Sequence, residues 1–359
     1  MAICARPIDA FTKAGRGAKL HSMRQDPNDT PLPTADSYLA DRCLPADASS
    51  IAEAARILRA GGLVAFPTET VYGLGADATS DIAVAKIYAA KGRPAFNPLI
   101  AHVEDLAAAR QQGIFTSEAE ALAKAFWPGP LTLVLPIAPT GNVCALARAG
   151  LDSVALRVPA HETTRRLLAA TGLPLAAPSA NISGHVSPVT AAHVAEDLDG
   201  RVDLILDAGP CPVGVESTII SCLKNGPTLL RPGGISREAI EAVLGRKLAD
   251  HAGGKAVLAP GQLASHYAPR ASLRLAATSL EPGEAGLDFG GRFPKAANVL
   301  DLSPRGDTTE AAANLFSHLR VLDARGFATI AVAPIPSTGL GEAINDRLKR
   351  AAAERPGAQ

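Results

Sequence analysis

The sequence is poor in the residues that mark disulfide frameworks, metal sites and membrane spans. Its five cysteines are odd in number and scattered, and no two of them have C-x-x-C spacing. A disulfide framework or a zinc site is therefore not expected, and a reducing cytoplasm is the expected setting. The apolar runs are of strand length and are interrupted by proline or charge, so none approaches the roughly 20 residues that cross a bilayer. We expect a soluble protein with no membrane contact and no protein-bound metal.

Several catalytic signatures are missing as well. The eight histidines show no H-x-x-x-H or H-E-x-x-H spacing, no G-x-S-x-G occurs, and residues 271–359 contain neither G-x-G-x-x-G nor a P-loop. These absences disfavour a serine nucleophile and a metal site built by protein ligands. Residues 46–245 carry 15 lysines and arginines against 19 aspartates and glutamates, a balance of −4. A module that binds nucleic acid through its phosphates would carry the opposite sign.

What the sequence does contain is a repeated alternation of helix and strand patterns. The 359 residues, 47% hydrophobic and 19% charged, suffice for two domains with well-filled cores. Residues 1–45 predict a poorly ordered extension, or a mis-assigned start with Met23 as the true one. An α/β domain around a twisted mixed sheet is expected over 46–245, a Gly- and Pro-rich linker over 246–270, and a smaller Rossmann-like α/β domain over 271–359.

Start and stop signals locate the individual elements. Ser50 and Glu53 have the spacing of a capping box, and apolar positions continue at helical spacing until Gly61. Further helices are expected at 80–90, 104–110, 117–126, from 161, from 190, from 236, at 308–325 and at 340–353. Strands are expected at 63–66, 99–102, 131–135, 154–158, 173–178, 203–209, 217–221, 227–231, 272–277, 297–302 and 328–335.

The segment "KGRPAFNP" is the first candidate for chemistry. Lys91 follows the last turn of a predicted helix, where a lysine also offsets the helix dipole without any further role. That explanation does not cover the group, because Arg93 lies between Gly92 and a proline and Asn97 precedes a second proline. An ammonium and a guanidinium held on a stiff loop suit a polyphosphate.

Polar side chains at other strand ends form the remaining candidates. In "APSANISG", Ser179 and Asn181 alternate and project to one side of an extended chain, although a plain turn explains the same residues. Arg157 and Arg231 each end a strand just before a proline, which suggests contacts with an anion rather than surface salt bridges. Ser217 begins a strand in "VGVESTII", together with its neighbours 216 and 218.

Two further residues have strong structural alternatives. His102 ends the strand "LIAH", where a lone histidine is more often a satisfied, half-buried residue than a catalyst. Thr132 lies on a strand behind a rigid Pro-Gly-Pro in "FWPGPLT", where a structural turn explains the pattern equally well. Neither residue carries a functional hypothesis by itself.

Seven segments in series resemble one family. "FPTETVYGLG", "KGRPAFNPLIAHV", "WPGPLTLVL", "VALRVP", "PSANISG", "GVESTII" and "LLRPGGI" occur in the order found in the Sua5/YrdC family, the L-threonylcarbamoyladenylate synthases. The match covers about residues 50–245, and the linker with the following α/β domain resembles the long two-domain form. The resemblance implies a nucleotidyltransferase that converts ATP, L-threonine and bicarbonate into threonylcarbamoyl-AMP and pyrophosphate. It also implies Mg²⁺ with the ATP, and a downstream threonylcarbamoyl-transferase complex that modifies position 37 of tRNAs reading ANN codons.

The resemblance also implies roles for particular residues. Its K-x-R signature falls on Lys91 and Arg93, the expected catalytic pair, and its S-x-N signature falls on Ser179 and Asn181. Residues expected at ATP are Lys91, Arg93, Asn97, Thr132, Ser179, Asn181, Arg231 and Tyr267 of the linker. Residues expected at L-threonine are Thr70, His102, Arg157 and Ser217. The hydroxyls of "FPTETVYGLG" would then line a small amino-acid pocket at a strand end, where α/β sheets commonly bind ligands.

One departure and two competing hypotheses remain. The linker "APGQLASHYAP" lacks the basic residues that the family usually has ahead of His266 and Tyr267, so a charge contribution from a linker lid is in doubt. A module that binds double-stranded RNA or tRNA without chemistry is the alternative function, and direct tRNA binding is left open. Carbamoyl transfer in hydrogenase maturation uses a related domain, but such proteins carry C-x-x-C pairs that are absent here.

Overall fold

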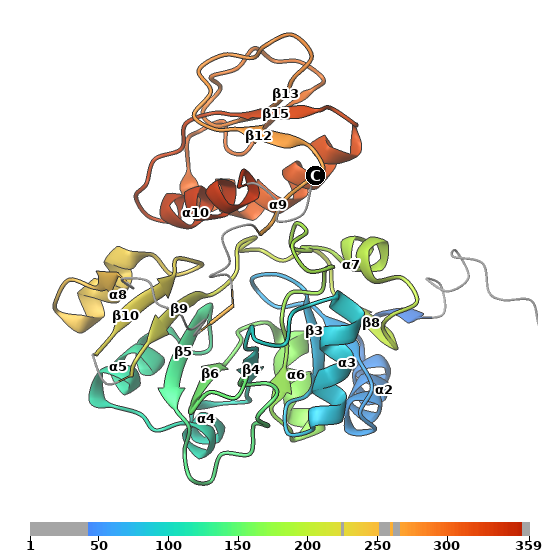
Figure 1. Ribbon diagram of the computed structural model, residues 1–359, viewed down its shortest axis with the longest axis vertical. Coiled ribbons are helices and arrows are strands. Elements are labelled where there is room, and N and C mark those ends of the chain that lie inside the picture. The colour runs from blue at the N-terminus through green and yellow to red at the C-terminus, as the bar shows by residue number, and fades with distance from the viewer. Residues whose placement is uncertain (1–41, 224–225, 251–258, 261–265, 354–359) are drawn as a thin grey trace, which may run out of the picture. The chain divides into compact units, whose positions relative to one another are not determined.

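Helices and strands alternate through the described chain, as the sequence predicts, and they build two sheets. The computed structural model describes residues 42–223, 226–250, 259–260 and 266–353 (Figure 1). Most of the predicted extension (1–41) and two parts of the predicted linker (251–258 and 261–265) lie outside the described residues. The described residues all belong to one compact unit of the chain.

The larger sheet has eleven strands of mixed direction. Their order is β1 (Cys43–Pro45), β8 (Leu204–Asp207), β2 (Val64–Phe66), β3 (Gly73–Asp77), β7 (Leu175–Ala176), β4 (Ile100–His102), β6 (Ser153–Arg157), β5 (Leu131–Pro136), β9 (Thr218–Ser221), β10 (Thr228–Arg231) and β11 (Ala249–Asp250). β4 runs parallel to β6, whereas β5 runs antiparallel to it. The edge strands β1 and β11 lie in segments that the sequence analysis assigns to the extension and the linker. They have three and two residues, too few for a period-two pattern.

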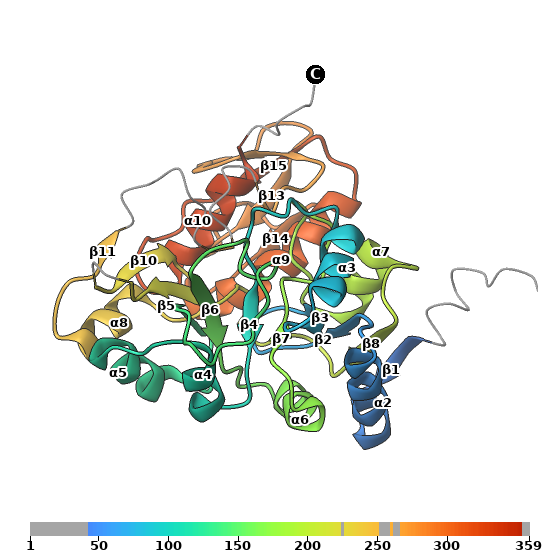
Figure 2. The ribbon, with the colours of Figure 1, turned by 60° about the horizontal axis from the view of Figure 1, so that its bottom comes forward.

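Helices pack on this sheet through apolar stripes. They are α2 (Ala48–Arg59), α3 (Asp81–Lys91), α4 (Leu106–Gln112), α5 (Ser117–Phe126), α6 (Glu162–Thr171), α7 (Ala191–Leu198) and α8 (Arg237–Leu244). Ile51 and Leu58 of α2, for example, join a buried cluster with residues of α6, β2 and β8. Figure 2 shows α2 next to β1, with β8 close by. The capping box predicted at Ser50 is wrong. Asp47 caps the helix, because its carboxylate accepts from the backbone amide of Ser50 inside the first turn.

Strand β3 explains the two glycines of "FPTETVYGLG". β3 pairs antiparallel with β2, and Gly75 lies opposite Val64. A Cβ atom built on Gly75 would lie 2.4 Å from the Phe66 ring, so only glycine fits there. The sequence analysis did not predict β3, since glycine weakens a strand and its position here depends on neighbouring strands.

The second sheet is small and fully parallel. Its strands lie in the order β12 (Ser272–Arg274), β15 (Thr329–Val332), β13 (Ala285–Asp288) and β14 (Val299–Asp301), and the helices α9 (Thr308–Ala324) and α10 (Gly341–Ala351) accompany it. The prediction of a second, smaller α/β sheet is confirmed. β13 was not predicted, because "AGLD" has neither β-branched residues nor alternation.

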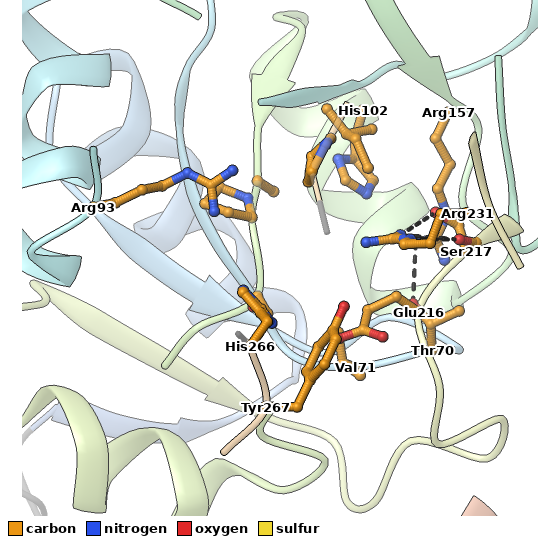
Figure 3. A pocket seen from close by; sticks show the side chains of 15 residues that line it. Thr70, Val71, Arg93, His102, Arg157, Glu216, Ser217, Arg231, His266 and Tyr267 are labelled. Carbon is orange, nitrogen blue, oxygen red and sulfur yellow. Dashed lines mark hydrogen bonds between the residues drawn. The ribbon is translucent and has the colours of Figure 1, made fainter. Parts of the chain in front are cut away.

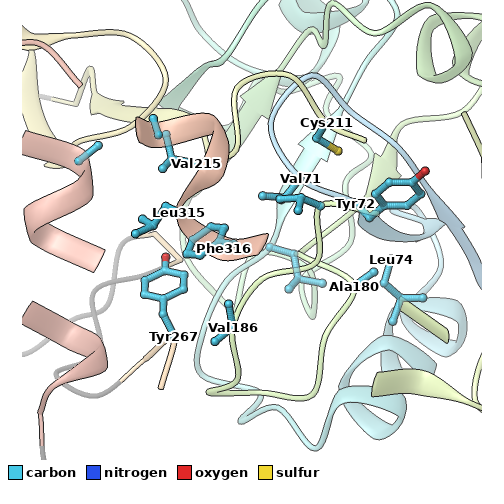
Figure 4. Close-up of a cluster of buried hydrophobic side chains, with 14 of the residues drawn as sticks. Val71, Tyr72, Leu74, Ala180, Val186, Cys211, Val215, Tyr267, Leu315 and Phe316 are labelled. Carbon is cyan, nitrogen blue, oxygen red and sulfur yellow. The ribbon is translucent and has the colours of Figure 1, made fainter. Parts of the chain in front are cut away.

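One hydrophobic cluster connects the two sheets. It contains residues of β3, β5 and β6 together with residues of α9, α10 and β15. Tyr267 stacks on Phe316 of α9, with ring centroids 5.6 Å apart, and Val186 and Val215 belong to the same cluster (Figure 4). The second sheet and its helices are therefore packed on the first through shared apolar contacts. In the described part of the chain, no helix combines the length and hydrophobicity that a membrane span requires.

Candidate active site

A cavity lies where several strands of the large sheet end. The space between its walls, open solvent included, is about 480 Å³. Its lining consists of Thr70, Val71, Arg93, Ile100, His102, Arg157, Ala177, Pro178, Ser179, Glu216, Ser217, Arg231, Pro260, His266 and Tyr267. Figure 3 shows Arg93 and Arg231 approaching the cavity from opposite sides.

The sheet register brings these side chains together. His102 ends β4 and Arg157 ends β6, and the two residues are direct partners in this parallel pair. On the other side, Ser217 precedes β9 while Arg231 ends the antiparallel strand β10. Strands far apart in sequence therefore deliver one polar side chain each to the same edge of the sheet.

The turn "PTETV" positions Thr70 through a network of its own hydroxyls. The Thr68 hydroxyl accepts from the backbone amides of Thr70 and Val71 and donates to the Val71 carbonyl. It also lies 2.8 Å from the Thr70 hydroxyl. The turn is thus closed by a threonine side chain in place of a regular backbone ladder. The hydroxyl run of "FPTETVYGLG" therefore has a structural role at Thr68 and a position in the cavity wall at Thr70.

Arg157 forms a buried ion pair with Glu69. Its Nη2 lies 2.6 Å from Glu69 Oε1, and its Nη1 donates to the Thr70 hydroxyl over 3.0 Å. Burial alone would raise the pKa of Glu69, but the Arg157 guanidinium lowers that pKa below its ordinary value. The Arg157 Nε has no hydrogen-bond partner among the described residues. This nitrogen is buried, so the protein leaves one hydrogen-bond donor of Arg157 unused.

Arg93 and Arg231 are held by uncharged acceptors. Arg93 donates to the carbonyl oxygen of Pro98 over 3.2 Å, and Arg231 donates to the carbonyl and hydroxyl oxygens of Ser217 over 2.9 and 3.2 Å. Burial lowers the pKa of Arg93 to about 10 and lowers the pKa of Arg231 as well. Both guanidinium groups are therefore cations in a poorly solvated environment.

Lys91 lies outside the cavity lining and binds the segment that carries Ser179. It ends α3, and its Nζ donates to the carbonyl oxygens of Ser179 and Asn181. Burial, and then the charge of Arg93, lowers the pKa of Lys91 well below its ordinary value. The K-x-R and S-x-N segments are thus joined by direct hydrogen bonds.

Two buried guanidinium cations, those of Arg93 and Arg231, and the buried Lys91 amine lack a carboxylate partner here. Within the described ranges, no Asp or Glu oxygen lies within 4 Å of a side-chain nitrogen of Lys91, Arg93 or Arg231. Leaving charges buried and unpaired destabilises a protein by several kcal/mol per ion. Such an arrangement is typical of a site that receives an anionic ligand, and a polyphosphate satisfies several cations at once.

Two histidines of the lining are neutral. Burial lowers the pKa of both His102 and His266 to about 3, and for His102 the charge of Arg157 acts in the same direction. Nδ1 of each ring has no hydrogen-bond partner among the residues that the structure describes. A neutral imidazole has one acceptor nitrogen, so each ring can accept a hydrogen bond, although a pKa of about 3 makes each a weak base.

Comparisons with known proteins decide the family. A family model for Sua5, YciO and YrdC proteins, described as "telomere recombination", matches residues 56–233, and the model of the threonylcarbamoyl-AMP synthase C-terminal domain matches residues 235–353. Threonylcarbamoyl-AMP synthase of Bacillus subtilis is 44% identical over 85% of this chain and 93% of that protein. The Schizosaccharomyces pombe enzyme of the same name is 37% identical over 85% of this chain and 88% of its own length. The crystal structure of Pyrococcus abyssi Sua5 complexed with L-threonine superimposes with a TM-score of 0.78 at 41% identity, covering 84% of this chain and 94% of that one.

The chain belongs to the Sua5/YrdC family. It is an enzyme of the nucleotidyltransferase type and has both domains of the long, Sua5 form. The fold class and the family that the sequence predicts are confirmed.

The cavity of this Sua5 member contains eight of the twelve residues predicted for its ligands. The eight are Thr70, Arg93, His102, Arg157, Ser179, Ser217, Arg231 and Tyr267. Lys91, Asn97, Thr132 and Asn181 are not in the lining, but each is connected to it. Thr132 lies 2.8 Å from the Ser217 hydroxyl, and the Asn97 carbonyl oxygen accepts from Arg93. Asn97 and Asn181 each have a buried Oδ1 without a partner in the described part of the protein. Contact of any of the twelve residues with ligand stays a prediction.

The sequence analysis assigned no role to three residues that shape this Sua5 site. Glu69 pairs with Arg157, Glu216 contributes a carboxylate to the lining, and Arg347 of α10 pairs with Glu216. Glu69 and Glu216 both lie inside motifs quoted in the sequence analysis. Each carboxylate needs a cation when it is buried, so a pairing with an arginine elsewhere in the chain could have been predicted for both. Arg347 has no such signal, because its contact joins residues 131 positions apart.

Proposed function

We propose that this protein makes threonylcarbamoyl-AMP from L-threonine, bicarbonate and ATP and releases pyrophosphate. We propose further that the product serves N6-threonylcarbamoyladenosine formation at position 37 of tRNAs reading ANN codons, through a downstream threonylcarbamoyl-transferase complex. The names of the relatives support the reaction, and the L-threonine complex of the similar Sua5 supports one substrate. The observation that carries the proposal is the group of buried cations without carboxylate partners beside a small polar pocket.

The nucleotide would lie along the cationic side of the cavity. Arg93 and Arg231 would bind phosphate oxygens with planar, paired donors, and Lys91 would place a point charge close to the α-phosphate. The other residues proposed for ATP are Asn97, Thr132, Ser179, Asn181 and Tyr267. Tyr267 presents an aromatic ring to the cavity, which suits contact with a nucleoside.

L-Threonine would lie on the side of Thr70 and Arg157. The Arg157 guanidinium suits the substrate carboxylate, since it lines the cavity and each Nη donates one N–H to Thr70 or Glu69 and keeps a second N–H. Thr70 and Ser217 would bind the polar groups of the amino acid. His102, neutral and directly beside Arg157 in the sheet, is the candidate to accept a hydrogen bond from the threonine amine, since a pKa of about 3 leaves it too weak a base to hold the proton.

The chemistry requires two bond-forming steps. The threonine nitrogen attacks the carbon of carbon dioxide and loses a proton to give a carbamate; from bicarbonate, the same product forms with cleavage of one C–O bond and release of water. A carbamate oxygen then attacks the α-phosphorus of ATP, and the bond to pyrophosphate breaks. The protein contributes positioning of three reactants and fixed positive charge where phosphate charge develops.

Mg²⁺ is proposed to enter with the phosphates of ATP. No cluster of three or more His, Cys, Asp or Glu side chains that could hold a metal occurs among the described residues. Glu216, the one carboxylate in the cavity lining, already accepts hydrogen bonds on both oxygens, from Ser187 and from Arg347. The lining does not fit a metal held by protein ligands, and no step is assigned to one.

Three parts of the chain would contribute to the proposed function. Residues 46–245 would form the catalytic domain, residues 246–270 the linker that supplies Tyr267, and residues 271–359 the C-terminal domain. The four cysteines in the described ranges are free, which agrees with a proposed site of action in the cytoplasm.

Pyrophosphate release is the direct test of the proposed function. The purified protein is incubated with ATP and bicarbonate, with and without L-threonine, and pyrophosphate and the adenylate product are quantified. We expect release that depends on L-threonine and that fails with serine or glycine. Release without an amino acid, or binding of RNA with strong salt dependence and no turnover, would contradict the proposal.

A further inference from the structure

Arg347 of α10 contacts two walls of the cavity from outside it. Its side chain is fully buried, its Nε lies 2.9 Å from Glu216 Oε2, and its Nη1 donates to the Pro232 carbonyl over 2.7 Å. Its guanidinium carbon lies 5.4 Å from the centre of the Tyr267 ring. Glu216 and Tyr267 both belong to the lining, whereas Arg347 does not. An arginine of the C-terminal part thus touches the acidic and the aromatic members of the site.

The Glu216 carboxylate is fixed in the wall by both of its oxygens. Oε1 accepts from the Ser187 hydroxyl over 2.6 Å, and Oε2 accepts from Arg347. The next residue along the chain, Ser217, binds Arg231 with its carbonyl and hydroxyl oxygens. The position of Glu216 therefore influences both the charge of the cavity and the anchor of Arg231.

Tyr267 also depends on its surroundings. Its φ angle is +63°, in the left-handed region that a residue other than glycine adopts only at an energetic cost. Phe316 stacks on one side of the ring, and the Arg347 guanidinium contributes a cation–π contact. Loss of Arg347 removes part of the packing that holds this conformation.

We propose that Arg347 is a positioning residue for ATP. It holds the Glu216 carboxylate and the Tyr267 ring in the cavity wall, and thereby leaves Arg231 available for the phosphates. Without Arg347, the buried Glu216 charge would be balanced by Arg231, with which it already interacts electrostatically. ATP would then compete with an internal carboxylate for this guanidinium. The role assigned to Arg347 rests on the proposed function, since ATP is the ligand concerned.

Docking of the C-terminal part is the competing explanation, and the chain offers a matched control for it. Arg320 of α9 also pairs with a carboxylate of the first part, with its Nη2 2.6 Å from Asp197 Oδ2. Arg320 is 11% exposed and donates to the Val186 carbonyl as well. Neither Arg320 nor Asp197 lines the cavity. Arg320→Met removes a comparable ion pair without touching Glu216 or Tyr267.

The test compares steady-state constants for Arg347→Met, Arg347→Lys, Arg320→Met and Glu216→Gln, with thermal unfolding of each variant. We expect Arg347→Met to raise KM for ATP about tenfold and KM for L-threonine less than about threefold, as loss of a buried, charged hydrogen bond predicts. Arg347→Lys retains the charge and recovers part of the loss. Arg320→Met lowers the unfolding temperature but changes KM for ATP by less than about twofold. In the Glu216→Gln background, Arg347→Met has a smaller effect on KM for ATP, because the part that acts through Glu216 is already lost and only the part that acts through Tyr267 remains.

Specific results would overturn the proposal. Equal kinetic effects of Arg347→Met and Arg320→Met would reduce Arg347 to a docking contact. An undiminished effect of Arg347→Met in the Glu216→Gln background would show that it does not act through Glu216. If Arg347→Met does not fold, the kinetic constants of Arg347→Lys and of the double variant with Glu216→Gln are compared with those of Arg320→Met in the same way. Absence of turnover in the wild type would instead refute the proposed function. ATP affinity measured by calorimetry on the same variants would then still test Arg347.

Discussion

Arg157 and Glu69 form a 2.6 Å ion pair in which the two side chains are 4% and 9% exposed. Glu69 Oε2 also accepts from the backbone amide of Ala160, three residues after Arg157 and the end of β6. The carboxylate therefore fixes both the guanidinium and the chain that follows it. We infer that Glu69 orients Arg157 for the substrate carboxylate, while Arg157 itself contacts the ligand.

Replacement of Glu69 tests this relationship. Glu69→Gln removes the charge of the partner but keeps the size of the side chain, and it leaves Arg157 as a buried, unpaired cation. We expect the free energy of unfolding to fall by about 3 kcal/mol without ligand. L-Threonine should restore more stability to the variant than to the wild type, because its carboxylate replaces the lost charge. Denaturant unfolding with and without L-threonine measures both effects. An unchanged stability, or a variant that gains nothing from L-threonine, would contradict the role of Glu69.

Arg93 is expected to contribute to ATP binding while it lowers, or leaves unchanged, the stability of the free protein. Arg93→Met removes a buried cation that has no carboxylate partner in the described chain, so the free protein should be as stable as the wild type or more so. Binding of ATP should be lost. The wild type should gain about 2.7 kcal/mol at an ATP concentration of 100 Kd, and the variant should gain nothing measurable. Thermal unfolding with and without ATP gives both values. A clearly destabilised free variant that still responds to ATP would count against an anion site at Arg93.

Lys91 is expected to act on the S-x-N segment as well as on the nucleotide. Lys91→Ala leaves the carbonyl oxygens of Ser179 and Asn181 without their donor and removes a charge from the α-phosphate region. We expect adenylate formation to be abolished while the circular dichroism spectrum stays that of the wild type. Exposed Lys86→Ala, on the same helix, is the control and should retain full activity. Full activity of Lys91→Ala would overturn its assignment.

The decrease in the free energy of unfolding at acid pH should depend on the Glu216 carboxyl. The pKa of this carboxyl is lowered from 4.5 to about 2, since Arg347 and Arg231 outweigh the effect of burial, which would raise it. Between about pH 2 and 4.5 the unfolded chain binds the proton and the folded protein does not. The stabilisation, of the order of 3 kcal/mol, is therefore complete above about pH 4.5 and is lost as the pH falls toward 2.

Two carboxylate variants separate this effect from general acid unfolding. Glu216→Gln should flatten the pH dependence of the unfolding free energy over that window, and the exposed Glu53→Gln should change it little. Chemical denaturation at a series of pH values from 3 to 7 provides the curves. Parallel curves for the wild type and Glu216→Gln would contradict a lowered pKa for Glu216.

The strand ends that form the site could be predicted because they carry local signals. Arg157 and Arg231 each stand before a proline at the end of an apolar run, and Ser179 and Asn181 follow a short strand. A strand does not require a polar or charged side chain at its end, so these patterns indicate a binding role for the side chains. Their convergence in one cavity then follows from the pairing of the strands, for example His102 beside Arg157.

Other features depend on contacts that no local pattern reveals. β3 contains two glycines and forms because β2 and β7 pair with it on either side. Position 75 must be glycine because the Phe66 ring occupies the place of a Cβ atom. The cap at Asp47 was missed because Ser50 offered a competing pattern three residues later. Arg347 is an unremarkable position on an amphipathic helix until the fold places it against Glu216. Tertiary contacts decide each of these cases.

The central claim is that one cavity holds ATP against Arg93 and Arg231 while it holds L-threonine against Arg157. A crystal structure with L-threonine and a non-hydrolysable ATP analogue tests it most directly. The account predicts phosphate oxygens within hydrogen-bond distance of Arg93 and Arg231, and the threonine carboxylate on Arg157. A nucleotide bound elsewhere, with these three arginines still facing only protein and water, would contradict it.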